Sequence, residues 1–185
     1  MSHLILVTGA ARSGKSEWAE QYAARSPLSV TYVATAQIDE SDAEWQARIS
    51  QHQQRRSPDW QTLHVPVTLA ETVQMATATQ CLLIDSLGTW LANRLEEDPD
   101  TWHQATQQLL QALQATRATV ILVAEETGWG VVPAYPIGRT FRDRLGALTR
   151  DIGAIADRVY LVVAGYALDL THLGTPLLPR DRESL

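Results

Sequence analysis

Short apolar runs alternate with amphipathic stretches along most of the chain. The apolar runs predict buried strands, because strands of a parallel sheet are covered on both faces. They lie at residues 4–7, 28–35, 81–86, 119–126 and 158–165. Helical spacing of apolar residues predicts helices at about 15–24, 42–56, 67–77, 87–95, 100–116 and 139–155. Residues 61–65 are a candidate for a further short extended piece.

Strands and helices that alternate in this way predict an α/β fold, in which a mostly parallel sheet carries helices on both faces. The alternation runs on without an internal repeat or a linker, so we expect a single domain over residues 1–185. The Gly-rich residues 127–138 are expected to form a loop. The tail, from about 171 to 185, is expected to be irregular.

Composition narrows the class of protein. Hydrophobic residues make up 45% and charged residues 19%, as in ordinary soluble globular proteins. The net charge of −6 argues against a general nucleic-acid binder. No segment approaches the ~18 continuous apolar residues of a membrane span, and no cationic leader precedes the first strand. The single cysteine, Cys81, excludes an intramolecular disulfide, and we expect a cytoplasmic protein.

Residues 9–16, GAARSGKS, match the pattern G-x-x-x-x-G-K-[ST] between a predicted strand and a predicted helix. Two glycines let the backbone curl so that N–H groups point at phosphate oxygens, and the helix N-terminus adds partial positive charge. Lys15 is the only lysine and can reach the β- and γ-phosphates, while the Ser16 hydroxyl can bind Mg²⁺. We predict a P-loop NTPase-type fold that binds a nucleoside triphosphate, against the alternative of a Gly/Ser turn before a helix. The predicted phosphate-binding residues are Gly9, Ala10, Ala11, Arg12, Ser13, Gly14, Lys15 and Ser16.

A P-loop site also needs an acidic group near Mg²⁺, usually at the end of a neighbouring strand. Asp85 ends the predicted strand 81–86, and Glu125 and Glu126 end the strand 119–126. An acidic residue at a strand end is as often a helix cap, so both interpretations stay open.

The stretch RISQHQQRR, residues 48–56, holds one histidine among three arginines. In a helix, Arg48, Arg55 and Arg56 lie within one turn of His52. Their positive field would keep the imidazole neutral and nucleophilic near neutral pH, and guanidinium groups suit phosphate binding. An exposed polar helix has the same pattern, and periodicity alone favours that interpretation. The other histidines show no metal-like spacing.

Six segments occur in an order that is typical of a known family. They read LILVTGAARSGKS, YVATAQ, DAEWQARISQHQQRR, CLLIDSLGTWLAN, VAEETGWGVVP and GRTFRDRLGALTRDIGAIADRVYLVVAG. Together they resemble adenosylcobinamide kinase/adenosylcobinamide-phosphate guanylyltransferase, a bifunctional family in the nucleotide-loop branch of cobalamin biosynthesis. The resemblance runs from Leu4 to about Gly165.

The resemblance implies two reactions. ATP or GTP phosphorylates the hydroxyl of the aminopropanol arm of adenosylcobinamide. GTP then transfers GMP to that phosphate through a covalent guanylyl-histidine, which yields adenosylcobinamide-GDP and pyrophosphate. The family's nucleophile corresponds to His52. Together with Lys15 of the P-loop, His52 is an expected catalytic residue. The family also implies a homotrimer.

Further nucleotide-binding residues are implied by the same resemblance. They are Thr35, Ala36, Gln37, Gln53, Gln54, Arg55, Arg56, His64 and Asp85. Two of them depart from the family pattern, since His64 stands where relatives carry an acidic residue and Asp85 stands where they usually carry Glu. Mg²⁺ is the expected metal, with Ser16 and Asp85 as its ligands.

Two other functions stay open on the sequence alone. One is a monofunctional P-loop kinase of a small molecule, in which His52 is a surface residue. The other is a nucleotide-dependent switch module. Also open are the phosphoryl donor, the residues that contact the corrinoid, and whether Asp85 or Glu126 serves the metal or the substrate hydroxyl. The sequence likewise does not say whether Arg139 and Arg142 face an active site.

Overall fold

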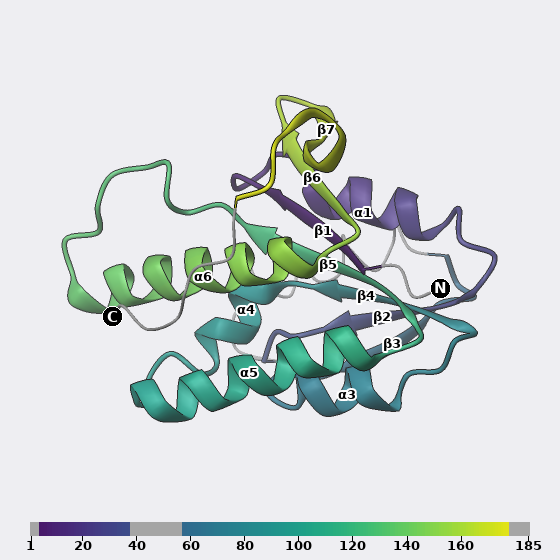
Figure 1. The fold of residues 1–185 in the computed structure, drawn as a ribbon, viewed down its shortest axis with the longest axis horizontal. Helices are drawn as coiled ribbons and strands as arrows, with labels where there is room; N and C mark the ends of the chain where they lie inside the picture. Colours follow the sequence, from purple (N-terminus) through teal and green to yellow (C-terminus); the bar gives the residue numbers. More distant parts are fainter. Residues whose placement is uncertain (1–3, 38–56, 178–185) are drawn as a thin grey trace.

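A computed structural model describes residues 4–37 and 57–177 (Figure 1). Its strands are β1 (Leu4–Gly9), β2 (Ser29–Ala34), β3 (Gln61–His64), β4 (Gln80–Asp85), β5 (Thr119–Glu125), β6 (Arg158–Val163) and β7 (Tyr166–Asp169). Its helices are α1 (Lys15–Ala23), α3 (Leu69–Met75), α4 (Leu87–Ala92), α5 (Pro99–Ala115), α6 (Pro136–Ile155) and α7 (Leu170–Leu173).

The seven strands form one sheet in the order β3-β2-β4-β5-β1-β6-β7. Every neighbouring pair is parallel except β6 and β7, which are antiparallel. The central strands are buried along nearly their whole length, as their continuous apolar sequences predict. The predicted α/β fold with a mostly parallel sheet is therefore confirmed.

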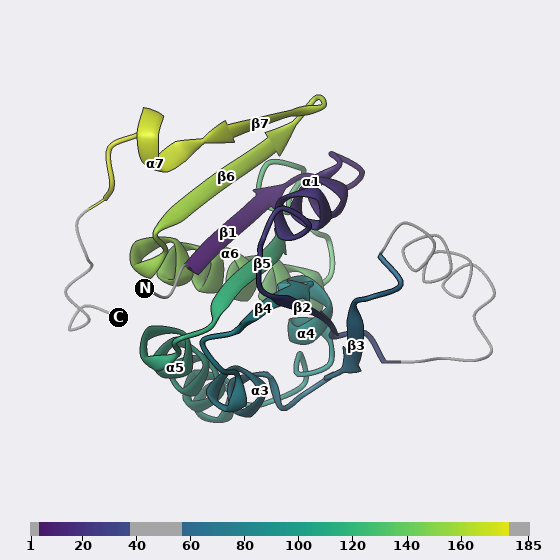
Figure 2. The ribbon, with the colours of Figure 1, turned by 90° about the vertical axis from the view of Figure 1, so that its right-hand side faces the viewer.

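Side chains of each strand point alternately to two separate cores. In β1, Leu4 and Leu6 join the larger core, which lies between the sheet and the helices α3, α4, α5 and α6. Ile5 and Val7 join the smaller core on the other face, together with Ala19 of α1. Figure 2 shows α1 on one side of the sheet and α3, α5 and α6 on the other. Helices thus cover both faces, as expected.

The parallel strands bring their carboxyl ends to one edge of the sheet. Ala34 is paired in register with His64 on one side and with Asp85 on the other. Gly9 is paired with Glu125. The residues that follow strands β1, β2, β4 and β5 therefore meet at this edge, where ligands bind in open α/β sheets.

Several details differ from the expectations. The strand predicted at 158–165 turns back at Ala164 and Gly165, which have φ values of 50° and 80°, and continues as β7. The tail expected to be irregular from about 171 begins inside α7. Helix α6 begins at Pro136, because proline suits the first turn of a helix. The helix predicted at 42–56 lies outside the described residues. In the part of the chain that the structure describes, no helix has the length and apolar character needed to cross a bilayer.

Candidate nucleotide-binding site

The predicted P-loop connects the end of β1 to the start of α1. Ser13 N donates to Ala10 O across 3.2 Å, which closes a tight turn within the loop. Arg12 and Gly14 have left-handed backbone, with φ values of 59° and 91°. Gly14 is the N-cap of α1, where left-handed backbone costs least in a residue without a side chain. The loop therefore curls over the positive end of a helix, as an anion site requires.

Gly9 is needed for a different reason, which is the close approach of a neighbouring strand. A Cβ atom at Gly9 would lie 2.3 Å from the Val162 carbonyl oxygen and 2.8 Å from Ser13 Oγ. A side chain at this position would push the loop away from β6. The glycine pattern thus serves packing at Gly9 and backbone conformation at Gly14.

Lys15 is drawn into the loop rather than extended into solvent. Its residue is only 8% exposed, and Nζ donates to the carbonyl oxygen of Ala10 across 3.4 Å. An ammonium group has three N–H donors, and this carbonyl accepts one of them. The amine is held above the loop backbone, which is where a P-loop lysine meets phosphate oxygens.

Asp85 lies beside the start of α1, and its carboxylate is bonded to a P-loop side chain. Its Oδ1 accepts from Ser16 Oγ across 3.4 Å, and its Oδ2 accepts from the Tyr32 hydroxyl across 2.9 Å. A hydroxyl and a carboxylate are hard oxygen ligands of the kind that Mg²⁺ takes. Among the described residues, no three His, Cys, Asp or Glu side chains gather at one metal site. The donor set fits a Mg²⁺ ion that keeps water and phosphate oxygens as its other ligands.

The two glutamates at the end of β5 have other partners. Glu125 accepts from the Ser86 hydroxyl and, across 2.9 Å, from Gly88 N at the start of α4. A Cβ atom at Gly88 would lie 2.1 Å from Glu125 Oε2, so the carboxylate packs directly on this glycine. Glu126 N donates to Gly9 O across 2.9 Å, and the Glu126 carboxylate turns to Gly128 N. Glu125 therefore anchors α4, and Glu126 ties the following loop to the P-loop.

Thr35 is buried, and its hydroxyl is bonded to Ser86. Its Oγ1 donates to Ser86 O across 2.7 Å and accepts from Ser86 N across 2.9 Å. This exchange joins the end of β2 to the end of β4. Ala36 is half-buried and Gln37 is exposed at the same edge. Thr35 thus positions the next two residues, whose side chains lie nearer to solvent.

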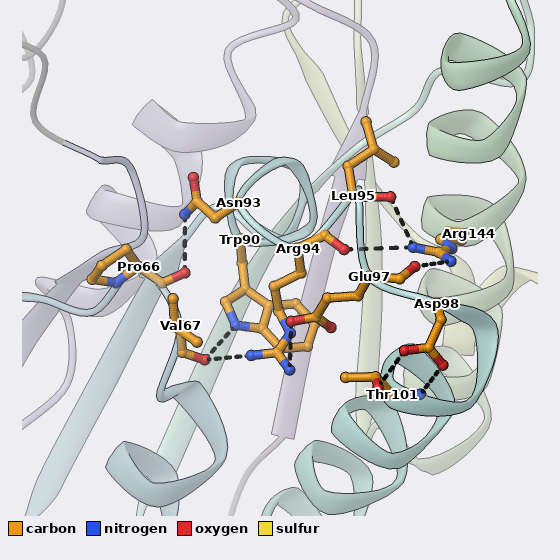
Figure 3. Close-up of polar contacts among 10 residues, drawn as sticks. All are labelled: Pro66, Val67, Trp90, Asn93, Arg94, Leu95, Glu97, Asp98, Thr101 and Arg144. Carbon is orange, nitrogen blue, oxygen red and sulfur yellow. Dashed lines mark hydrogen bonds and ion pairs between the residues drawn. The ribbon is translucent and has the colours of Figure 1, made fainter.

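Asn93 is a residue of this region that the sequence interpretation did not identify. Its Nδ2 donates to Thr35 O across 2.7 Å and to Pro66 O across 2.9 Å. Figure 3 shows Asn93 and Trp90 reaching from α4 toward the segment that follows β3, where Trp90 Nε1 donates to Val67 O across 2.9 Å. One amide group thereby holds together the chain that leaves β2 and the chain that leaves β3. The feature of the sequence that could have indicated this role is the spacing of Trp90 and Asn93, two hydrogen-bond donors three residues apart at the end of an apolar helix.

The remaining predicted residues that the structure describes lie at the same edge of the sheet, with their side chains toward solvent. Ala10, Ala11 and Arg12 are exposed in the loop, and His64 is exposed at the end of β3. His52 and residues 53–56 lie outside the described residues.

Arg139 and Arg142, whose relation to the active site the sequence did not settle, interact with residues close to them in the chain. Arg139 NH1 donates to the carbonyl oxygens of Pro133 and Ala134, and Arg142 pairs with Asp143 across 2.9 Å. The Arg139 contacts tie the start of α6 to the loop before it, whereas the Arg142–Asp143 pair lies within α6.

Relatives of the chain were found by sequence. A family model described as cobinamide kinase / cobinamide phosphate guanyltransferase matches residues 5–170. The bifunctional adenosylcobalamin biosynthesis protein CobP of Pseudomonas aeruginosa is 42% identical over 174 residues, which cover 93% of this chain and 98% of that protein. The bifunctional adenosylcobalamin biosynthesis protein CobU of Escherichia coli (strain K12) is 37% identical over 182 residues, which cover 90% and 99%. Each match extends over nearly the whole length of both proteins.

Solved structures resemble the fold at much lower identity. A protein from Pyrococcus horikoshii OT3 has a TM-score of 0.57 at 8% identity, covering 96% of this chain and 94% of that chain. An ATPase from the type III secretion system of pathogenic bacteria has a TM-score of 0.51 at 10% identity, covering 92% and 58%. At identities of 8% and 10%, these similarities support the fold and not a shared function.

Proposed function

Because this chain belongs to the cobinamide kinase / cobinamide phosphate guanyltransferase family, we propose that its P-loop site serves both reactions and that GMP passes through His52. The bifunctional activity in adenosylcobalamin biosynthesis follows from the family. The use of one site for both steps, and the role of each residue in them, are our proposals. The observation that carries them is the meeting of Lys15, Ser16 and Asp85 at one edge of the sheet.

In the kinase reaction, the P-loop binds the triphosphate of ATP or GTP. Backbone N–H groups of the P-loop and the Lys15 ammonium hold the phosphate oxygens, and Ser16 and Asp85 would hold Mg²⁺. When bound, Mg²⁺ neutralises charge on the phosphates and on the leaving group. The substrate hydroxyl attacks the γ-phosphorus, so that a new P–O bond forms while the bond to the nucleoside diphosphate breaks, and the hydroxyl proton is released to solvent.

In the guanylyl transfer, we infer that His52 is the nucleophile. A neutral imidazole nitrogen attacks the α-phosphorus of GTP, forming a P–N bond while the P–O bond to pyrophosphate breaks. A phosphate oxygen of the phosphorylated corrinoid then attacks the same phosphorus, and the P–N bond breaks to restore the histidine. Arg48, Arg55 and Arg56 offset the charge that develops on the phosphates. Family membership and the RISQHQQRR segment support this proposal, since His52 lies outside the described residues.

We further propose that residues 1–185 form a single nucleotide-binding domain, and that the protein acts in the cytoplasm as a homotrimer. Thr35, Ala36, Gln37, Gln53, Gln54 and His64 complete the proposed nucleotide site. The described part of this set, Thr35 to Gln37 and His64, lies at the carboxyl edge of the sheet together with Asp85, which supports its placement.

The guanylyl carrier is tested with labelled GTP. The protein is incubated with Mg²⁺ and GTP labelled at the α-phosphate or, separately, at the γ-phosphate. We expect acid-labile label on the protein from the α-position only, and none on His52→Ala. His103→Ala is the matched control and keeps the label, because His103 is an exposed residue of α5 outside the proposed nucleotide site.

The alternatives give different results in the same experiment. Phosphorylation of cobinamide without any covalent label would leave a monofunctional kinase. Hydrolysis of the triphosphate without transfer to any acceptor would favour a switch module. Either result would contradict the proposed role of His52.

A further inference from the structure

The loop between β5 and α6, together with the first turn of α6, presents large apolar side chains to solvent. Those at residues 127–137 are Trp129 (67% exposed), Val131 (95%), Val132 (64%), Tyr135 (77%) and Ile137 (54%). We call these residues the apolar shelf. Apolar surface gathered in one short segment in this way usually marks a site of binding.

The backbone beneath the apolar shelf is held in shape by the start of α6. Arg139 NH1 donates to Pro133 O across 2.9 Å and to Ala134 O across 2.7 Å. Pro133 also packs on Gly138, where an added Cβ atom would lie 2.8 Å from Pro133 Cβ. The carbonyl groups of the loop are therefore bonded to Arg139 of α6, while the apolar side chains of the loop remain exposed to solvent. A surface organised before binding loses less entropy when a ligand arrives.

The apolar shelf begins next to the P-loop. Glu126, three residues before Trp129, donates its N–H to Gly9 O across 2.9 Å. Figure 1 shows the loop leaving the carboxyl end of β5 and projecting beyond the sheet before it reaches α6. The phosphate-binding turn and the apolar shelf are thus joined at one edge of the molecule.

We propose that the apolar shelf binds the corrin ring of adenosylcobinamide, an inference that rests on the proposed function. The acceptor hydroxyl has to come within about 3–3.5 Å of the phosphorus it attacks, so its flexible arm must enter the P-loop site. The macrocycle at the other end of that arm must then rest on a surface that adjoins the P-loop. The macrocycle offers apolar ring carbons and methyl groups, against which Trp129 and Tyr135 can pack and which Val131 and Val132 can cover.

A second copy of the chain is the competing occupant of this surface. The molecule has another exposed apolar set better suited to a subunit contact, consisting of Tyr166, Leu168, Leu170, Leu173 and Leu177. Two of these residues, Tyr166 and Leu168, lie in β7, which is an edge strand of the described sheet. An edge strand also offers unpaired main-chain groups to a second copy. The apolar shelf is instead distinguished by its connection to the nucleotide site, which favours a substrate.

The test uses the kinase reaction of the full chain with adenosylcobinamide and ATP. Trp129→Ala and Val131→Asp are compared with Met75→Asp, a control whose residue is equally apolar and 82% exposed but ends α3, ahead of β4. We expect KM for adenosylcobinamide to rise about tenfold or more in both shelf variants, with KM for ATP unchanged. The control keeps both values. Sedimentation should give the same assembly for all four proteins.

Two results would overturn this inference. One is an unchanged KM for adenosylcobinamide in both shelf variants. The other is a loss of assembly in the shelf variants with a parallel change in both KM values, which would assign the loop to a subunit contact. A wild-type protein that does not phosphorylate adenosylcobinamide would contradict the proposed function instead, so the two failures are distinguishable.

Discussion

Ser16 Oγ donates a hydrogen bond to Asp85 Oδ1 across 3.4 Å, which joins the first turn of α1 to the end of β4. The two residues are far apart in the sequence and meet because β4 and β1 are parallel and separated only by β5. In the proposed mechanism this pair holds Mg²⁺ beside the phosphates.

Removing the charge of Asp85 should therefore weaken the metal site. We expect Asp85→Asn to lower the apparent affinity for Mg²⁺ in the kinase reaction by at least about 10-fold, since losing even an outer-shell partner of a metal ligand costs about 10- to 100-fold. The measurement is the Mg²⁺ concentration that gives half-maximal rate at saturating ATP. Glu126→Gln is the control, because its carboxylate turns to Gly128 N, and its Mg²⁺ dependence should match the wild type. Equal Mg²⁺ dependence in Asp85→Asn and wild type would remove Asp85 from the metal site.

Asn93 should contribute to stability through the two carbonyl groups that it bridges. In Asn93→Ala, the carbonyl oxygens of Thr35 and Pro66 lose their donor in a partly buried place. We expect the free energy of unfolding in urea to fall by about 1–3 kcal/mol. KM for GTP should rise as well, since Thr35 precedes residues of the proposed nucleotide site. A variant with wild-type stability and wild-type KM would show that the bridge has no such role.

Two helix glycines should respond in opposite directions to alanine. Gly88→Ala places a methyl group 2.1 Å from Glu125 Oε2, so the carboxylate must move and release Gly88 N. We expect a loss of about 1–3 kcal/mol in the free energy of unfolding. Gly146→Ala, in α6, meets no atom within 4 Å and should gain roughly 0.5–1 kcal/mol from helix propensity. Urea unfolding of both variants measures these changes, and a Gly88→Ala variant as stable as the wild type would contradict the proposed anchoring of α4 by Glu125.

Cys81 should make the fold less stable in alkaline solution. Burial raises the pKa of its thiol from 9.0 to about 11. Above pH 9 the unfolded chain therefore loses this proton while the folded chain keeps it, so stability falls as pH rises between these two values. From about pH 7 to about pH 10, the wild type should lose about 1.4 kcal/mol more than Cys81→Ala. Urea unfolding at both pH values measures this difference. Equal losses of the free energy of unfolding in the wild type and Cys81→Ala would contradict a raised pKa of the thiol.

The sequence predicted those features that depend on neighbouring residues or on strand ends. The P-loop was recognisable because Gly14 and Lys15 act within one turn, and Asp85 was a candidate because parallel strands end at one edge. The hairpin of β6 and β7 was missed, since four residues after Gly165 are too few to show a period. The partners of Asn93 and the contact between Gly88 and Glu125 were also missed, because both depend on which distant segments the fold brings together. The exposure of Val131 and Trp129 could not be read from their apolar character.

The central claim is that one P-loop site serves both reactions, and Lys15→Met tests it most directly. This variant keeps most of the unbranched side chain and removes its charge, and circular dichroism and thermal unfolding check that it folds. One preparation is assayed for phosphorylation of adenosylcobinamide and for labelling of the protein by α-labelled GTP. We expect both activities to fall together by at least about 100-fold, since each needs the same ammonium on the triphosphate. A folded variant that loses one activity and keeps the other at the wild-type rate would contradict a shared site.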